Sequence, residues 1–139
     1  MTHRAALAER LREKGLRVTQ QRVAVLEYLC ATPTHPTADQ IGTAVNRAEP
    51  TMSRASVYNV LHSLKERGLI EELVFDDAVA RYDANLGPHH HFVCTRCGAV
   101  QDVPFDALPP VPKRRLPSGH TVDSVDVTLR GTCPGCAKA

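Results

Sequence analysis

The chain has 139 residues, of which 42% are hydrophobic and 23% are charged, which favours one or two small folded domains and excludes a disordered chain. No apolar run reaches the length that a bilayer requires, and segment 1–15 is charged and amphipathic, unlike a secretory signal. We therefore expect a cytoplasmic protein whose five cysteines stay reduced and serve metal or redox chemistry.

The net charge of +2 is small, but the basic residues are unevenly placed. Segment 1–22 carries six Arg and Lys residues against two Glu residues. Positive charge gathered at one end is typical of a surface that contacts DNA. A solvated helix face would give the same pattern, so charge alone leaves both interpretations open.

Four short helices are predicted in the first half of the chain, in segments 3–14, 19–30, 37–45 and 53–68. Thr19, Thr37 and Ser53 are the expected N-caps, because their hydroxyls can accept a hydrogen bond from the backbone of the first turn. Gln40 completes a capping box with Thr37. These caps fix where three of the four helices begin.

Apolar residues recur at helical spacing in these segments. In the second helix the stripe ends at Cys30, which we expect to be a buried small apolar residue. The fourth helix has the clearest stripe, formed by Val57, Val60, Leu61 and Leu64. Gly68 is the expected end of that helix.

Segments 69–75 and 79–84 have the composition of two strands and are separated by a short turn, which predicts a hairpin. Helices that end in a hairpin describe a winged helix-turn-helix, in which the helix before the hairpin enters the major groove of DNA. The expected fold class is α+β, with a winged helix-turn-helix domain in residues 1–84. A small helical domain without a ligand is the alternative.

Segment 85–88 is rich in turn-forming residues and is the expected hinge between two domains. After it the pattern changes to strands, which predicts a small α/β domain over 89–139. Alternating apolar and polar residues predict a half-buried strand over 125–131. Four prolines in segment 105–120 permit at most a short helix after Pro104.

Two Cys-x-x-Cys pairs are separated by 35 residues, and they consist of Cys94, Cys97, Cys133 and Cys136. Two such pairs complete a tetrahedral shell of four sulfurs, which is typical of structural zinc. A thioredoxin-like dithiol is the alternative, but that motif belongs at a strand-to-helix junction, whereas strands flank the first pair here. A closed shell of four sulfurs leaves no position for catalysis.

A second metal site is expected among nitrogen and oxygen ligands. His89 and His91 lie two apart on a predicted strand, so they share one face, and His90 faces the other side. The further candidates are His35, Asp83 and Asp102. Imidazoles with carboxylates suit Fe²⁺, Mn²⁺ or Zn²⁺. A metal bound by both halves of the chain would fix the angle between them, whereas ordinary surface histidines are the alternative.

The motifs "GLRVTQQRVAVLEYL", "HPTADQI", "SRASVYNVLHSLKERGLI", "ARYD", "HHHFVCTRCGAV" and "GTCPGC" together resemble the ferric uptake regulator (Fur) family of bacterial metal-dependent repressors. The resemblance covers about residues 10–136. Within the family the chain is most similar to the peroxide-responsive repressors (PerR), which share the aspartates at positions 83 and 102.

This resemblance implies a homodimeric winged-helix repressor of transcription, with an N-terminal DNA-binding domain and a C-terminal dimerisation domain in 89–139. The four paired cysteines would hold structural zinc. His35, Asp83, His89, His91 and Asp102 would hold regulatory Fe²⁺ or Mn²⁺. Peroxide would oxidise His35 or His89, after which the protein would leave a pseudo-palindromic DNA operator.

Contacts to DNA carry over from the family only loosely, and the candidates are Arg17, Arg54, Ser56, Tyr58 and Asn59. The chain also departs from the family. Pro88 stands where many members have a ligand of another metal site, so that site is expected to be absent and His90 is not expected to be a ligand. The prolines at 109, 110 and 112 fall where the family has a longer helix.

Two other functions remain open on the sequence. A Fur-type or Zur-type repressor could sense iron or zinc supply without any histidine oxidation. A zinc hydrolase is a remote alternative, because the sequence has no nucleophile motif and no H-E-x-x-H. The expected protein is therefore a regulator and not an enzyme.

Overall fold

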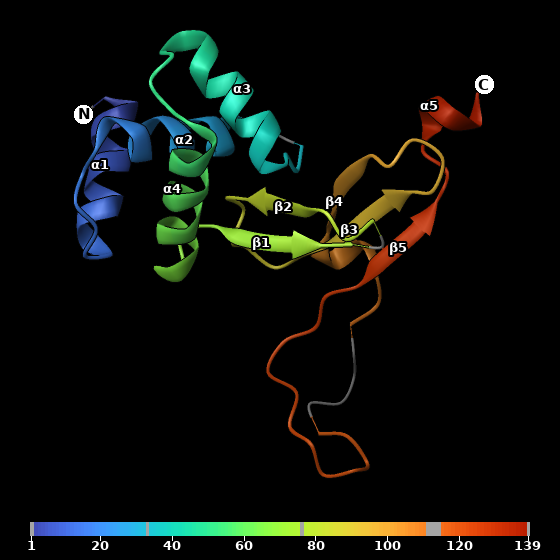
Figure 1. The fold of residues 1–139 in the computed structure, drawn as a ribbon. Helices are drawn as coiled ribbons and strands as arrows, with labels where there is room; N and C mark the ends of the chain where they lie inside the picture. The colour runs from blue at the N-terminus through green and yellow to red at the C-terminus, as the bar shows by residue number, and fades with distance from the viewer. Residues whose placement is uncertain (1, 33, 76, 111–114, 139) are drawn as a thin grey trace. The chain divides into compact units, whose positions relative to one another are not determined.

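A computed structural model describes residues 2–32, 34–75, 77–110 and 115–138. The chain divides into two units, Met1–Leu86 and Gly87–Ala139. Among these described residues, the first unit contains four helices and a two-stranded hairpin, and the second contains a three-stranded sheet (Figure 1). Within the described ranges, no helix is long and apolar enough to cross a bilayer.

The four predicted helices are confirmed, and they are α1 (His3–Glu13), α2 (Gln20–Ala31), α3 (Ala38–Ala48) and α4 (Arg54–Glu66). The side chains of Thr19 and Ser53 accept hydrogen bonds from backbone N–H groups of the first turns of α2 and α4. Both bonds of the capping box between Thr37 and Gln40 are present. Local side-chain chemistry therefore sets where these helices begin.

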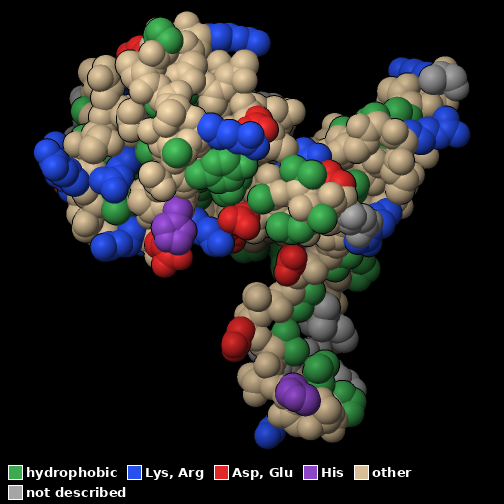
Figure 2. Space-filling model, in the orientation of Figure 1, with side chains coloured by type: hydrophobic (Ala, Val, Ile, Leu, Met, Phe, Trp, Pro, Cys, Tyr) green, Lys and Arg blue, Asp and Glu red, His purple; other side chains and the backbone are tan. Residues whose placement is uncertain are grey.

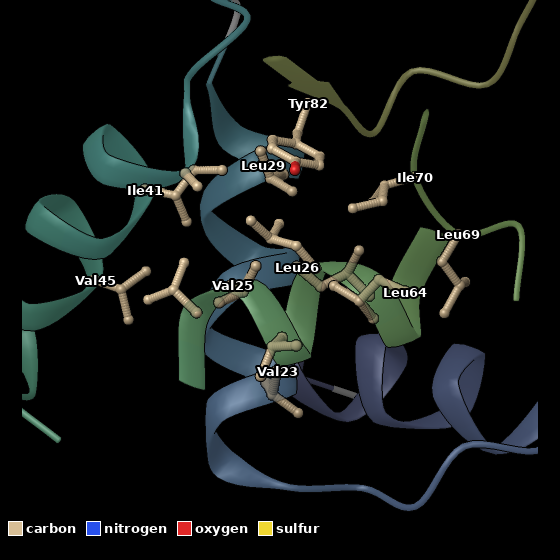
Figure 3. Packing of buried hydrophobic residues seen from close by; sticks show 14 of the residues in the cluster. Val23, Val25, Leu26, Leu29, Ile41, Val45, Leu64, Leu69, Ile70 and Tyr82 are labelled. Atoms are coloured by element: carbon tan, nitrogen blue, oxygen red, sulfur yellow. The ribbon is translucent and has the colours of Figure 1, made fainter. Parts of the chain in front are cut away.

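One apolar core joins the four helices to the hairpin, and Figure 3 shows Val25, Leu26, Ile41, Leu64 and Tyr82 converging in it. The prediction for Cys30 is wrong, because its side chain is exposed. Helix α2 packs against α1, α3 and α4, so its inward sector is centred on Val25, Leu26 and Leu29. Cys30 lies at the edge of that sector, where its Sγ is 3.7 Å from Arg10 Nη1.

Helices α1 and α4 end in the same way. Gly68 has a positive φ of 71°, its N–H donates to the Lys65 carbonyl, and the Leu69 N–H donates to the Leu64 carbonyl. Gly15 repeats this arrangement at the end of α1. In such an ending, glycine takes up the left-handed turn and the two bonds satisfy carbonyls that the helix leaves free. At the end of α4 this arrangement leads the chain into the hairpin.

The predicted hairpin is confirmed as β1 (Glu71–Val74) paired antiparallel with β2 (Ala80–Asp83). Tyr82 lies in the core, so the neighbouring residues Arg81 and Asp83 point to the other face of β2. The free edge of β2 also receives the loop before α3, because the Tyr82 N–H donates to the Pro36 carbonyl at 3.0 Å. The loop that contains His35 is thus attached to the hairpin.

The second unit is a sheet of order β4-β3-β5, made of β3 (His89–Cys94), β4 (Val100–Pro104) and β5 (Thr128–Gly131). Strand β4 pairs antiparallel and β5 pairs parallel with β3. A short 3-10 helix, η1 (Phe105–Ala107), follows Pro104, within what the prolines of this segment permit, and α5 (Pro134–Ala137) is the last helix described. Part of the proline-rich segment, 111–114, lies outside the described residues.

The predicted strand over 125–131 is wrong at its beginning, because β5 starts only at Thr128. His90 supplies the physical reason: its Nδ1 accepts the Val127 N–H at 2.8 Å, so a side chain occupies a donor that a longer strand would use. The His90 ring also stacks on Phe105, with ring centres 4.9 Å apart. The structure thus gives His90 a role within the sheet.

Candidate metal centres and DNA-contact surface

The structure brings the four paired cysteines together. One sulfur from each of Cys94, Cys97, Cys133 and Cys136 lies within 4.8 Å of every other. Cys97 Sγ and Cys133 Sγ are 3.8 Å apart. Sulfur ligands at about 2.3 Å from a tetrahedral zinc ion are separated by about 3.8 Å, so the spacing fits that ion. The donor set and its spacing both suit structural zinc.

The backbone around the cluster favours thiolate at one sulfur. Cys94 is buried, and its Sγ accepts the N–H of Cys97 at 3.5 Å and of Cys133 at 3.4 Å. These donations lower the pKa of Cys94 to about 6. The neighbouring sulfurs, that of Cys133 foremost, raise the pKa of Cys136 to about 12. A bound cation would oppose this increase in pKa, because it stabilises several neighbouring thiolates at once.

In the first unit, His35 and Asp83 form a close pair. His35 Nε2 lies 3.2 Å from Asp83 Oδ2, and both residues are buried. The other carboxylate oxygen, Oδ1, accepts the Asn85 N–H at 2.8 Å, which fixes the orientation of the carboxylate. His35 comes from the loop before α3 and Asp83 from the end of β2. Together they offer one nitrogen and one oxygen to a metal.

In the second unit, His89, His91 and Asp102 converge, and the register explains why. His91 is paired with Asp102 across β3 and β4, and His89 lies two residues from His91 on the same face. The two Nε2 atoms are 3.1 Å apart, and Asp102 Oδ1 is 3.3 Å from His89 Nε2 and 3.7 Å from His91 Nε2. Adjacent ligands of a metal at about 2.1 Å are roughly 3.0–3.4 Å apart, so the distances of 3.1 and 3.3 Å fit such a site, and the third, between His91 and Asp102, is longer.

The hydrogen bond on the far side of His89 orients its ring. Its Nδ1–H donates to the Gly87 carbonyl oxygen at 2.6 Å, which fixes the tautomer with the lone pair on Nε2. Rings that bind metal commonly donate their other nitrogen in this way. His89 Nε2 is therefore prepared to be a ligand, whereas His90 Nδ1 already accepts a backbone N–H.

Three of the predicted DNA contacts surround one hollow in the first unit. Arg17, Ser56 and Asn59 line a cavity of about 360 Å³ together with Thr19, Gln21, Arg22 and Val60. The hollow lies at the N-terminus of α2 and along α4. Backbone N–H groups and basic side chains at such a position favour a phosphate. Sequence reasoning missed Gln21 and Arg22, because only the packing of α2 against α4 brings them there.

The other two predicted contacts, Tyr58 and Arg54, are exposed on α4. Tyr58 is 44% exposed, which leaves its ring accessible to a base. Arg54 pairs with Asp39, with Nε 3.3 Å from Oδ1. A contact with DNA by Arg54 would therefore replace an existing surface ion pair.

Basic charge at the N-terminus is partly neutralised within the first unit. Arg4 lies 3.1 Å from Glu27, and Arg12 lies 3.1 Å from Glu9. Arg22 Nη1 donates to the Arg17 carbonyl at 2.7 Å and so shapes the rim of the hollow. On the face shown in Figure 2, Lys and Arg side chains still cover more of the helical unit than acidic side chains do.

Comparisons with known proteins agree with this arrangement. The sequence pattern of the "Ferric uptake regulator family" matches residues 13–130. The peroxide operon regulator of Bacillus subtilis (strain 168) is 39% identical over 131 residues, which cover 94% of this chain and 90% of that protein.

Solved structures show the same likeness. PerR from Streptococcus pyogenes, described as a basis for peroxide sensing and gene regulation, is 32% identical with a TM-score of 0.54, over 98% of this chain and 94% of that one. The ferric uptake regulator from Francisella tularensis, solved with iron, is 25% identical with a TM-score of 0.75, over 88% and 96%. This chain therefore belongs to the ferric uptake regulator family and is similar to its peroxide-responsive repressors.

Proposed function

We propose that this protein is a metal-dependent, DNA-binding repressor of transcription that responds to hydrogen peroxide. The observation that carries the proposal is the convergence of His89, His91 and Asp102, in which the Nδ1–H of His89 is already committed to a carbonyl. Such a set binds a transition metal rather than a substrate. The proposals of DNA binding and of a response to peroxide are supported by the relatives of this protein, which include a peroxide operon regulator and a PerR described as sensing peroxide and regulating genes.

Two different metals are proposed for the two clusters. Zn²⁺ at the four cysteines would hold the C-terminal helix α5 to the sheet, because Cys94 ends β3 and Cys97 lies three residues later, whereas Cys133 caps α5 and Cys136 lies within it. Fe²⁺ or Mn²⁺ would occupy the nitrogen and oxygen ligands, which are harder than thiolates. Thiols engaged with zinc would be protected from direct oxidation.

The regulatory metal is proposed to take His35 and Asp83 from the first unit and His89, His91 and Asp102 from the second. Each set alone is an incomplete shell. Only five residues separate Asp83 from His89, so the two sets are tethered within at most about 20 Å. Closing both on one ion would select one arrangement of the two units, and only that arrangement would bind DNA with high affinity.

Peroxide sensing is proposed to take place on a ligand ring. Bound ferrous iron would supply the redox chemistry that activates peroxide, which manganese does not supply as readily. One oxygen atom of the peroxide would replace a ring hydrogen of His35 or His89 as a new carbon–oxygen bond, and the other would leave as water. The oxidised ring would be a poorer ligand, so the closed arrangement and the hold on DNA would both be lost.

The proposed partners are a second copy of the chain and double-stranded DNA. A two-fold dimer implies a pseudo-palindromic operator, since each half-site meets the same protein surface. In each copy, α4 would enter the major groove, and the hollow beside Arg17 would hold a backbone phosphate. The proposed compartment is the cytoplasm, where operators and reduced thiols are both found.

The test is to map oxygen on histidines after peroxide. Zinc-containing protein is loaded anaerobically with Fe²⁺ or with Mn²⁺, treated with substoichiometric peroxide and analysed by peptide mass spectrometry. We expect one added oxygen on His35 or His89 in the iron sample only. His62 and His120, outside the proposed ligands, are internal controls that should stay unmodified.

The same samples are tested for DNA binding before and after peroxide. Metal-dependent binding that peroxide abolishes together with histidine oxidation supports the proposal. Metal-dependent binding without any oxygen on histidine rejects peroxide sensing by oxidation and leaves a sensor of metal supply. DNA binding that ignores Fe²⁺ and Mn²⁺ altogether rejects both.

A further inference from the structure

Arg81, on strand β2, connects the turn of the hairpin with the backbone of His35. Its Nη2 lies 3.0 Å from Asp77 Oδ2, in the turn between β1 and β2. Its Nη1 donates to the His35 carbonyl oxygen at 3.3 Å, although the two residues are 46 positions apart in the sequence. One guanidinium group therefore bridges two segments of different proposed function.

The environment of Arg81 differs from that of an ordinary surface arginine. Its side chain is only 18% exposed. Its Nε is buried and has no hydrogen-bond partner among the described residues. Burying an unpaired N–H costs free energy, and an arginine that only had to pair with Asp77 could remain in water. The buried placement points to a positional role for this side chain.

Arg81 and Asp83 hold His35 from two sides. They lie two residues apart on β2, so both project from the face opposite to Tyr82. Arg81 holds the carbonyl of His35, and Asp83 lies 3.2 Å from its ring. A backbone bridge between Thr37 and Arg81 fixes the same loop to the strand edge. A displacement of His35 is therefore a displacement against β2.

The other end of the connection is equally fixed. Asp77 Oδ1 accepts the Val79 N–H at 3.1 Å, while its Oδ2 pairs with Arg81. The turn is completed by a bond from the Ala78 N–H to the Phe75 carbonyl, and Ala78 has a positive φ of 59°. A displacement of the Arg81 guanidinium would therefore act on Asp77 and, through Asp77, on the backbone of Val79.

We propose that Arg81 is a positioning residue that couples His35 to the hairpin turn, so that a change in the coordination of His35 alters the hold of the wing on DNA. This inference rests on the proposed function, which makes His35 a regulatory ligand and the hairpin a wing. It adds the route within the first unit: His35 carbonyl, Arg81, Asp77 and the turn.

The experiment measures how strongly Mn²⁺ binding changes the affinity of the protein for DNA. Full-length zinc-containing protein is titrated against a DNA duplex selected from a random pool with the Mn²⁺-loaded wild type, with and without saturating Mn²⁺. The coupling ratio is the Kd for DNA without Mn²⁺ divided by the Kd for DNA with Mn²⁺. The variants are Arg81→Met and Arg81→Lys, with Asp77→Asn breaking the ion pair on the turn side only. Arg47→Met, an exposed arginine on α3, is the matched control.

We expect Arg81→Met and Asp77→Asn to lower the coupling ratio by about fivefold or more, while Arg47→Met keeps the wild-type ratio. Arg81→Lys should also lose coupling, since one ammonium cannot replace a fork that reaches two partners. Mn²⁺ affinity measured without DNA should persist in Asp77→Asn, because that change leaves the His35 contact intact. A uniform change in DNA affinity cancels in the ratio.

Hydrogen exchange provides a second measurement without DNA. In the wild type, Mn²⁺ should protect amides in segment 34–37 and also in segment 74–80. In Arg81→Met and Asp77→Asn, protection should remain in the first segment and disappear from the second. A role in folding stability alone would not separate the two segments.

Wild-type coupling and protection in both Arg81→Met and Asp77→Asn would overturn the inference. So would loss of Mn²⁺ binding in Asp77→Asn, which would make the ion pair a support of the metal site rather than a link to the wing. If Mn²⁺ has no effect on DNA binding by the wild type, the proposed function itself is wrong, and this failure is distinguishable from a failure of the role inferred for Arg81.

Discussion

The four clustered cysteines differ in what surrounds each sulfur. Cys94 is buried and accepts two backbone N–H bonds, so its replacement would disturb the turn as well as any metal. Cys97 is exposed, so its replacement disturbs packing least. The contribution of a metal is therefore best isolated at Cys97.

Cys97→Ser should reduce bound zinc to background and lower the unfolding free energy of Gly87–Ala139 by several kcal/mol, because an incomplete shell of three sulfurs binds the ion poorly. Zinc content and thermal unfolding measure this. Cys30→Ser is the control, since Cys30 is exposed and lies outside the cluster. Equal zinc content in both variants would show that the cluster does not hold the metal.

Cys30 also shows a limit of periodicity. The residue falls on the stripe that Val23 and Leu26 begin, yet it is exposed. The apolar stripe of a helix indicates which face of the helix packs against the core. The width of the buried sector depends on how many neighbouring elements contact the helix. Helix α2 has three helical neighbours, whose positions the sequence of α2 does not contain.

At the scale of elements, the junction between α4 and β1 depends on one backbone conformation. Gly68 has φ of 71°, and a Cβ atom built there would meet nothing within 4 Å. Glycine is therefore required here because of its positive φ, and not because a side chain would lack space. The two hydrogen bonds beside it direct the chain from α4 into the hairpin.

Gly68→Ala should lower the unfolding free energy by about 1–2 kcal/mol, which is the cost of the left-handed conformation for a residue with a Cβ atom. Urea unfolding of the full chain measures it. Gly68→Asn is the matched variant and should retain most of the stability, since asparagine tolerates this conformation better. Equal losses in both variants would contradict a purely conformational cause.

Strand β5 shows how a side chain can determine where a strand begins. Alternation of apolar and polar residues extends back to Val125, but the ladder with β3 begins at Thr128. His90 reaches across and accepts the Val127 N–H. Alternation in sequence reports which residues could face a core, whereas a ladder also requires a free partner.

At the scale of the whole molecule, DNA binding depends on charges that remain available after folding. Arg4 and Arg12 are paired with glutamates, while Arg17 lines the hollow between α2 and α4. A count of basic residues in segment 1–22 therefore overstates the positive charge that a phosphate would meet.

Arg17→Ala should weaken DNA binding for all sequences and reduce the slope of log Kd against log salt by about 1, because one phosphate contact is lost. Titrations at several salt concentrations measure this. Arg12→Ala is the control, with its guanidinium 3.1 Å from Glu9. The same slope in Arg17→Ala as in the wild type would exclude a phosphate contact by this residue.

The sequence by itself determined most of the local structure and the chemical character of the sites. Capping residues, apolar spacing and Gly68 predicted the four helices and the hairpin, because these signals act within a few residues of one another. The paired cysteines and the spacing of His89 and His91 predicted ligand sets, because metal chemistry constrains both residue type and spacing.

Only the tertiary structure decided what depends on residues far apart in the chain. It placed Arg81 against His35, brought Gln21 and Arg22 to the hollow beside α4, left Cys30 at the surface and gave His90 a partner in Val127. Each of these outcomes follows from packing between elements. Packing selects among side-chain partners that a local pattern leaves equally open.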